Sequence, residues 1–84
     1  MDKMDIRVAL SVADKITTYG ERRGEGFFLA GLLATPSFDG YTVTISDEKV
    51  SMDIQFHNKF ILDYESKKSL NEFMLKLERV ERDY

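Results

Sequence analysis

Residues 41–64, YTVTISDEKVSMDIQFHNKFILDY, decide the fold of this chain. Apolar and polar side chains alternate along three short runs within this stretch, over residues 41–46, 49–56 and 60–64. Alternation with a period of two predicts β-strands that bury one face and leave the other face in water. We therefore expect three consecutive strands of an antiparallel sheet, joined by two hairpin turns.

The turns between these strands set the predicted register. A two-residue turn at Asp47-Glu48 places the apolar residues of both flanking strands on one face. The pairs are then Ile45 with Val50, Val43 with Met52 and Tyr41 with Ile54. A three-residue loop over 57–59 is preferred for the next hairpin, because a shorter loop would direct Lys59 into the core. Its pairs are Phe56 with Phe60 and Ile54 with Leu62.

The first helix is predicted over residues 3–19. Asp2 or Asp5 caps its start, and Gly20 ends it as a left-handed stop. Its apolar arc spans about 200°, roughly twice the width usual for a surface helix. One sheet does not easily cover such an arc, so we expect a second burying surface, either the other helix or a second subunit.

The second helix is predicted over residues 66–82 and has one apolar face of ordinary width. Two caps are possible for its start. Ser66 is one candidate, and Ser69 with Glu72 forms an alternative capping box.

The segment between the first helix and residue 41 carries fewer signals. Residues 20–26 are predicted to be a polar loop, because three glycines occur among seven residues. Residues 27–34 are predicted to form a first strand, with Gly31 as a bulge or a close contact. Residues 35–40 are predicted to form a turn in which Pro36 blocks strand pairing.

The predicted order is α-β-β-β-β-α in a single domain, residues 1–84. A four-stranded antiparallel meander is covered on one face by two helices, which makes an α+β two-layer sandwich.

Composition narrows the function classes. The chain has 84 residues, a net charge of −3 and no cysteine, so neither disulfides nor thiolate metal sites are available. The negative charge argues against general binding to nucleic acid. No apolar run approaches the length of a membrane span, and the N-terminus does not resemble a signal peptide. We expect a cytoplasmic protein without a cofactor.

The wide apolar arc of the first helix favours a protein-interaction module without enzymatic activity, which binds a protein partner or forms a homodimer. The residues expected at this interface are Val8, Val12, Tyr19, Phe28 and Leu32. The alternative is that the second helix and the sheet cover the whole arc.

The outer sheet face offers a different hypothesis, a small-ligand or divalent-cation site or a small enzyme. The predicted register sets Asp53 directly across from Asp63, with Thr42 on the other side of Asp53 and His57 further along. Opposed carboxylates repel each other and are groups that acid–base catalysis or Mg²⁺ would use. The simpler interpretation is an exposed polar face, with His57 as a solvated turn residue.

A third hypothesis is nucleic-acid binding through Arg22, Arg23 and the pair Lys67-Lys68. Neighbouring glutamates offset these charges, and the predicted sheet aromatics point inward, so the sequence disfavours it.

Three short segments carry a resemblance to known sequences: residues 38–43 (FDGYTV), residues 56–60 (FHNKF) and Asp63-Tyr64. Through them the chain resembles a family of short gammaproteobacterial proteins of unknown function. The resemblance implies a bacterial cytoplasmic protein and supplies no activity, ligand or site.

Overall fold

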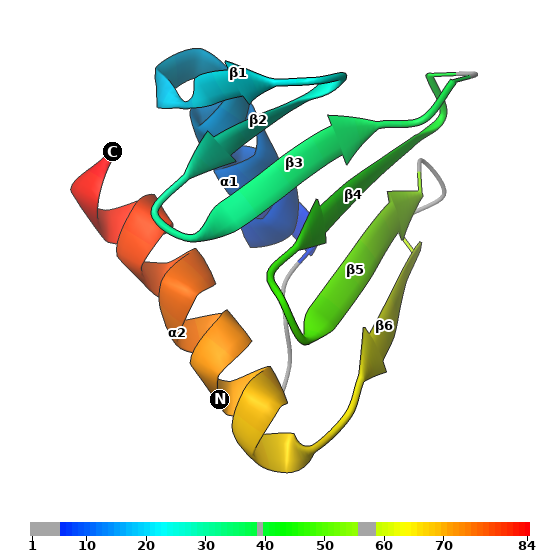
Figure 1. Ribbon diagram of the computed structural model, residues 1–84, viewed down its shortest axis with the longest axis vertical. Coiled ribbons are helices and arrows are strands. Elements are labelled where there is room, and N and C mark those ends of the chain that lie inside the picture. The colour runs from blue at the N-terminus through cyan, green and yellow to red at the C-terminus, as the bar shows by residue number, and fades with distance from the viewer. Residues whose placement is uncertain (1–5, 39, 56–58) are drawn as a thin grey trace.

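A six-stranded antiparallel sheet with two helices packed on one face forms the molecule (Figure 1). The structure is a computed structural model that describes residues 6–38, 40–55 and 59–84. The strands lie side by side in their sequence order, so the sheet is one continuous meander. The predicted α+β class is therefore confirmed, whereas the predicted count of four strands was wrong.

The two predicted helices are present. α1 spans Ile6–Tyr19 and α2 spans Lys67–Asp83. The strands are β1 (Glu21–Arg23), β2 (Gly26–Leu29), β3 (Leu32–Pro36), β4 (Thr42–Ser46), β5 (Val50–Gln55) and β6 (Lys59–Tyr64). Ser66 is the N-cap of α2, since its side chain accepts a hydrogen bond from the Ser69 N–H at 3.1 Å. The first of the two predicted caps is thus confirmed, and Asp2 and Asp5 lie outside the described residues.

Gly20 ends α1 for a reason other than the predicted one. Its φ angle is not positive, so it is not a left-handed stop. A Cβ at this position would lie 2.4 Å from the Ile16 carbonyl oxygen and 2.7 Å from that of Phe28. Only glycine therefore allows the chain to pass this closely between α1 and β2.

The predicted polar loop 20–26 contains a short hairpin. β1 pairs with β2 from Glu21↔Phe28 to Arg23↔Gly26, which leaves Gly24-Glu25 as a two-residue turn. Gly24 has a φ of 60°, as the first central residue of a type II′ turn requires.

The predicted strand 27–34 is likewise two strands. Leu29 pairs with Leu32, so the chain reverses at Ala30-Gly31, where both residues have positive φ angles of 53° and 84°. Positive φ at both central positions is the requirement of a type I′ turn. Gly31 is therefore a turn residue and not a bulge.

Pro36 does not block pairing, because it lies where its missing N–H is not needed. Ser37 donates its N–H to the Thr42 carbonyl, so the adjacent pair Pro36↔Val43 is one in which the N–H would point away from β4. β2 does not extend far enough to accept a bond there. β3 therefore continues through Pro36.

The β4–β5 register differs from the predicted one by two residues. Ile45 pairs with Met52 and Val43 with Ile54. The turn consists of Glu48-Lys49, because the Asp47 carboxylate accepts the N–H groups of Lys49 and Val50, both at 2.8 Å. A shift of two residues keeps every side chain on its predicted face.

The β5–β6 register is also displaced by two residues. Ile54 pairs with Phe60, and Met52 pairs with Leu62. Gln55↔Lys59 closes the hairpin, so Lys59 belongs to the strand and not to the loop. Residues 56–58 lie outside the described residues.

One core joins both helices to the inner sheet face. Ala9, Val12, Ala13 and Ile16 of α1 are buried in it, as are Phe73, Leu77 and Val80 of α2 and residues of β3, β4 and β5. α1 contacts α2 as well as the sheet, so the second helix supplies much of the additional cover that the wide apolar arc of α1 requires.

Candidate functional site

β6 forms one edge of the sheet and pairs only with β5 among the described strands (Figure 1). It is six residues long and carries four large apolar side chains. These are Phe60, Ile61, Leu62 and Tyr64. An unpaired strand edge presents free N–H and C=O groups to any extended chain, so this edge is the main candidate binding surface.

The hydrogen bonds of the neighbouring hairpin show which β6 groups face outward. Asp47 donates its N–H to the Val50 carbonyl, so every second β5 residue from Val50 onward bonds to β4. The alternate residues bond to β6, and Asp53 pairs with Ile61 among them. Phe60 and Leu62 therefore direct their N–H and C=O groups to the open edge.

The side chains of β6 alternate between the two sheet faces. Phe60 and Leu62 lie on the inner face, half-buried against the core. Lys59, Ile61 and Asp63 lie on the outer face and are exposed. Ile61 is 55% exposed on a face whose β4 and β5 residues are polar, so it stands out as an uncovered apolar group.

The opposite edge of the sheet is protected. β1 has only three residues, all of them charged and exposed. The Arg23 guanidinium lies 4.0 Å from the centre of the Phe28 ring, and Arg23 is 3.6 Å from the Glu21 carboxylate. Short, charged edge strands discourage pairing with other chains, so the two edges of this sheet differ in kind.

The five predicted interface residues do not form one surface. Val12 and Leu32 are fully buried in the chain's own core, so they are not available to a partner. Val8 is half-buried, and Phe28 lies half-buried beneath Arg23 on the outer face. Tyr19 is 61% exposed, and the centre of its ring lies 5.9 Å from the centre of the Tyr84 ring.

The predicted carboxylate pair is not formed. Asp53 lies opposite Ile61, and Asp63 lies opposite Ser51, because of the displaced register. Thr44, and not Thr42, is the other neighbour of Asp53 and donates its hydroxyl to the carboxylate at 2.8 Å.

A cation site finds no support in the part of the chain that the structure describes. That part contains no group of three or more His, Cys, Asp or Glu side chains placed to hold a metal ion. His57 lies outside the described residues.

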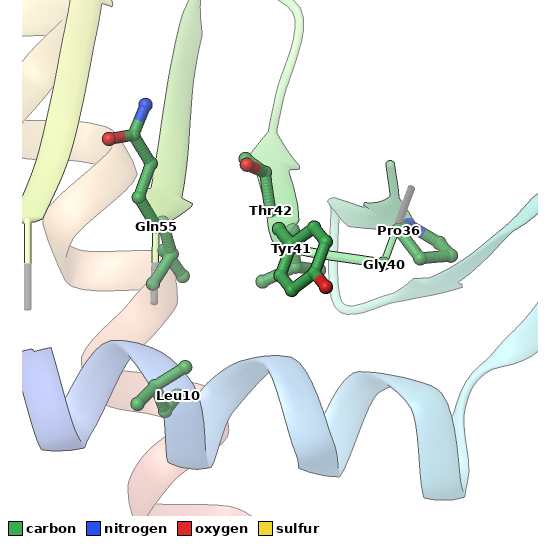
Figure 2. Close-up of a pocket in the computed structure, with 8 residues that line it drawn as sticks. Leu10, Pro36, Gly40, Tyr41, Thr42 and Gln55 are labelled. Carbon is green, nitrogen blue, oxygen red and sulfur yellow. The ribbon is translucent and has the colours of Figure 1, made fainter. Parts of the chain in front are cut away.

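Two hollows in the surface are candidate ligand sites. The first, of about 140 Å³, lies between α1 and the sheet, where Leu10 of α1 and Tyr41, Thr42 and Gln55 of the sheet side line it (Figure 2). Pockets for drug-sized ligands occupy roughly 300–1,000 Å³. This hollow is too small for that class.

The second hollow, of about 390 Å³, lies at the end of the outer face near the β2–β3 and β4–β5 turns. Lys76 of α2 reaches it and donates to the Asp47 carboxylate at 3.0 Å. Arg23 covers Phe28 on its other side. Lys76 is paired with Asp47, and Arg23 lies against Glu21 and Phe28, so these groups do not single out a ligand.

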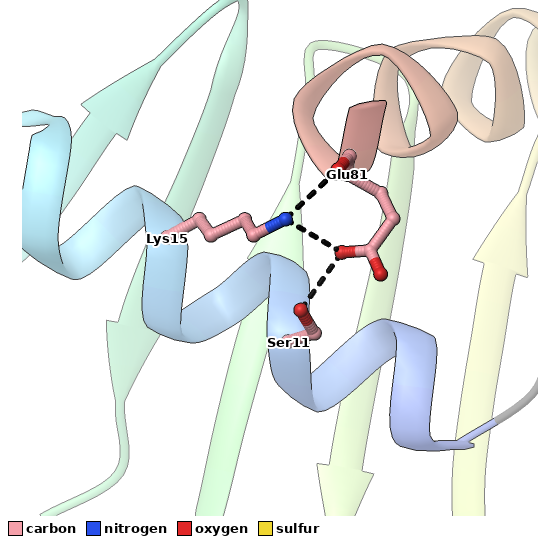
Figure 3. Close-up of polar contacts among 3 residues, drawn as sticks. All are labelled: Ser11, Lys15 and Glu81. Atoms are coloured by element: carbon pink, nitrogen blue, oxygen red, sulfur yellow. Dashed lines mark hydrogen bonds and ion pairs between the residues drawn. The ribbon is translucent and has the colours of Figure 1, made fainter. Parts of the chain in front are cut away.

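The main polar contact between the helices is structural. The Glu81 carboxylate of α2 accepts the Ser11 hydroxyl at 2.7 Å and the Lys15 ammonium at 3.1 Å, and Lys15 also donates to the Glu81 carbonyl (Figure 3). Hydrogen bonds from Ser11 and Lys15, followed by the charge of Lys15, hold the pKa of Glu81 below its usual range against the effect of burial. This clamp fixes α1 against α2.

The β6 edge was not among the sites predicted from the sequence, although the sequence carries one signal for it. Ile61 interrupts an otherwise polar outer face, and its place on an edge strand follows only from the sheet order.

Among the described residues, neither helix has the length and apolar character needed to cross a membrane.

Comparison with known proteins identifies the family and no function. No curated protein and no solved structure matches the chain significantly. The sequence profile of the family described as Protein of unknown function (DUF3081) matches residues 4–84, and the chain belongs to that family.

Proposed function

We propose that this protein is a non-enzymatic interaction module that binds an extended polypeptide segment at the β6 edge, as a seventh strand of its sheet. The observation that carries the proposal is the contrast between the two edges. β6 is long, apolar and open, whereas β1 is short and fully charged. Main-chain hydrogen bonds provide affinity in such strand addition, and alternate side chains provide specificity.

The location of this interaction is part of the same proposal. We place it in the bacterial cytoplasm, which the cysteine-free composition and the resemblance to gammaproteobacterial sequences support. Fractionation of cells that express the tagged chain at native level tests this location, and recovery with the membrane or secreted fraction would contradict it.

Selection of random peptides against the immobilised chain tests the binding mode without knowledge of the natural partner. We expect selected peptides to perturb the amide NMR signals of Phe60 and Leu62, whose N–H groups face outward. Peptides that map to another element would contradict the proposal.

Two sequence variants and one backbone modification sharpen the test. Ile61→Lys places a charge beside the bound strand and should weaken peptide binding by about tenfold. Leu75→Lys is the matched control, because Leu75 is exposed to a similar degree (58%) but lies on α2. Replacement of Leu62 by N-methylleucine removes one outward donor and keeps the side chain, so it should also weaken binding.

A further inference from the structure

We infer that the segment which pairs with β6 is β6 of a second copy of this chain, antiparallel and centred on Ile61. This inference rests on the proposed function and names its partner. The edge itself limits the possible registers, because Phe60 and Leu62 carry the outward N–H and C=O groups. Each must therefore face an outward-directed residue of the other copy.

The register centred on Ile61 meets this requirement. Phe60 then exchanges hydrogen bonds with Leu62 of the partner subunit, and Leu62 does the same with the partner's Phe60. On the inner face these half-buried side chains would cover each other at the boundary of the core. The apolar surface at the edge of one copy is thereby buried against the identical surface of the other copy.

Charge complementarity favours the same register on the outer face. Lys59 and Asp63 lie two residues before and two residues after Ile61, on the same face as Ile61. In the symmetric pair, Lys59 faces Asp63 of the partner subunit, Asp63 faces the partner's Lys59, and the two exposed Ile61 side chains meet. Cross-strand pairs of opposite charge and of apolar residues stabilise antiparallel strands.

The neighbouring registers lack this match. A pair centred on Leu62 sets Ile61 against Asp63 of the partner subunit, and a pair centred on Phe60 sets Lys59 against the partner's Ile61. Both place an apolar side chain against a charge twice. Of the three registers, only the one centred on Ile61 therefore makes the sequence of β6 self-complementary.

The resulting assembly is closed. Pairing joins two six-stranded sheets into one of twelve strands and consumes the open edge of both copies. The outer edges are then the two β1 strands, which are short and charged. Such an assembly stops at the dimer.

Charge reversal tests both the partner and the register, with sedimentation equilibrium as the measurement. Lys59→Asp and Asp63→Lys each turn two attractions into two repulsions, so each should weaken the dimer by about tenfold. An equimolar mixture of the two variant chains should form a heterodimer tighter than either homodimer, because its facing charges are opposite again. The doubly substituted chain, K59D/D63K, should recover the affinity to within about threefold.

Lys68→Asp and Glu72→Lys are matched controls, because they change the net charge equally at exposed positions of α2. Lys59 and Asp63 are exposed, so the variants should fold, and circular dichroism checks this. A wild-type chain that remains monomeric at high micromolar concentration, or a dimer that neither reversal weakens, overturns the inference. Selected peptides that still bind β6 would then preserve the proposed function, whereas peptides that bind elsewhere would remove both.

Discussion

Ala30 is held in a conformation that its side chain disfavours. Its φ of 53° lies in the left-handed region, where a residue with a Cβ loses roughly 1–2 kcal/mol. Asparagine tolerates this region and is preferred in type I′ turns. We therefore expect Ala30→Asn to stabilise the fold by about 0.5–1 kcal/mol, seen as a higher urea midpoint at an unchanged slope. Ala30→Val should have the opposite effect, and a lower midpoint for the asparagine variant would contradict the turn assignment.

Asp47 links the β4–β5 turn to α2. Its side chain is only 6% exposed and accepts the N–H groups of Lys49 and Val50 and the ammonium of Lys76. Burial raises the pKa of Asp47, but these hydrogen bonds and the charge of Lys76 outweigh burial and lower it below its ordinary 3.8.

The stabilising effect of Asp47 should therefore depend on pH. A folded-state pKa below the unfolded one means that the contribution is complete above about pH 4 and is lost as pH falls through the folded value. We expect Asp47→Asn to cost about 1 kcal/mol at pH 7, and the gap to wild type to shrink towards pH 2. Urea midpoints across this range provide the measurement. Asp14→Asn, at an exposed position, should show little change at any pH, and a constant gap for Asp47→Asn would refute the explanation.

At the scale of elements, the sequence predicts faces better than registers. Alternation over residues 41–64 assigns each side chain to the inner or outer face, and a displacement of two residues leaves that assignment intact. The β4–β5 displacement depends on whether the Asp47 side chain bonds to the backbone of Lys49 and Val50, a local turn interaction that periodicity does not contain. The carboxylate pair Asp53–Asp63 failed because the β5–β6 hairpin is displaced as well, with Lys59 paired to Gln55 instead of lying in the loop.

Short elements were missed because their signals are weak. Ala30 is an unusual residue for a type I′ turn, so residues 27–34 resembled one strand instead of two. Residues 21–23 are charged throughout and have no alternation, and they are a strand only because β2 lies beside them. Helix ends were easier, since Ser66 and Gly20 mark them in the sequence.

The clamp between α1 and α2 should have a small and salt-sensitive energy. Lys15 and Glu81 are 23% and 38% exposed, so solvent weakens their attraction. A double-mutant cycle with Lys15→Met and Glu81→Gln should give a coupling energy of about 0.5 kcal/mol in low salt, falling at high salt. A coupling of zero in low salt would mean that the contact does not hold the helices together.

At the scale of the whole molecule, the wide apolar arc of α1 was expected to need a second covering surface, either the other helix or a second subunit, and α2 supplies much of that cover. α2 and the sheet cover Val12 and Ile16, whereas Leu10 and Tyr19 of α1 stay partly exposed, and Ile61 is an exposed apolar group on the edge strand β6. No local pattern predicts this, because the edge position of a strand is a property of the complete sheet order. The candidate site was therefore visible only after assembly of the fold.

Pairing at β6 should link stability to protein concentration. A dimer that only the folded chain forms shifts the unfolding equilibrium by mass action, so the thermal midpoint of the wild type should rise with concentration. For a domain of 84 residues we expect about 5 °C over a hundredfold range. Ile61→Lys should remove this dependence, and Leu75→Lys should retain it, which calorimetry at several concentrations can measure. A midpoint that is independent of concentration in every chain would mean that the β6 edge stays open in the folded protein.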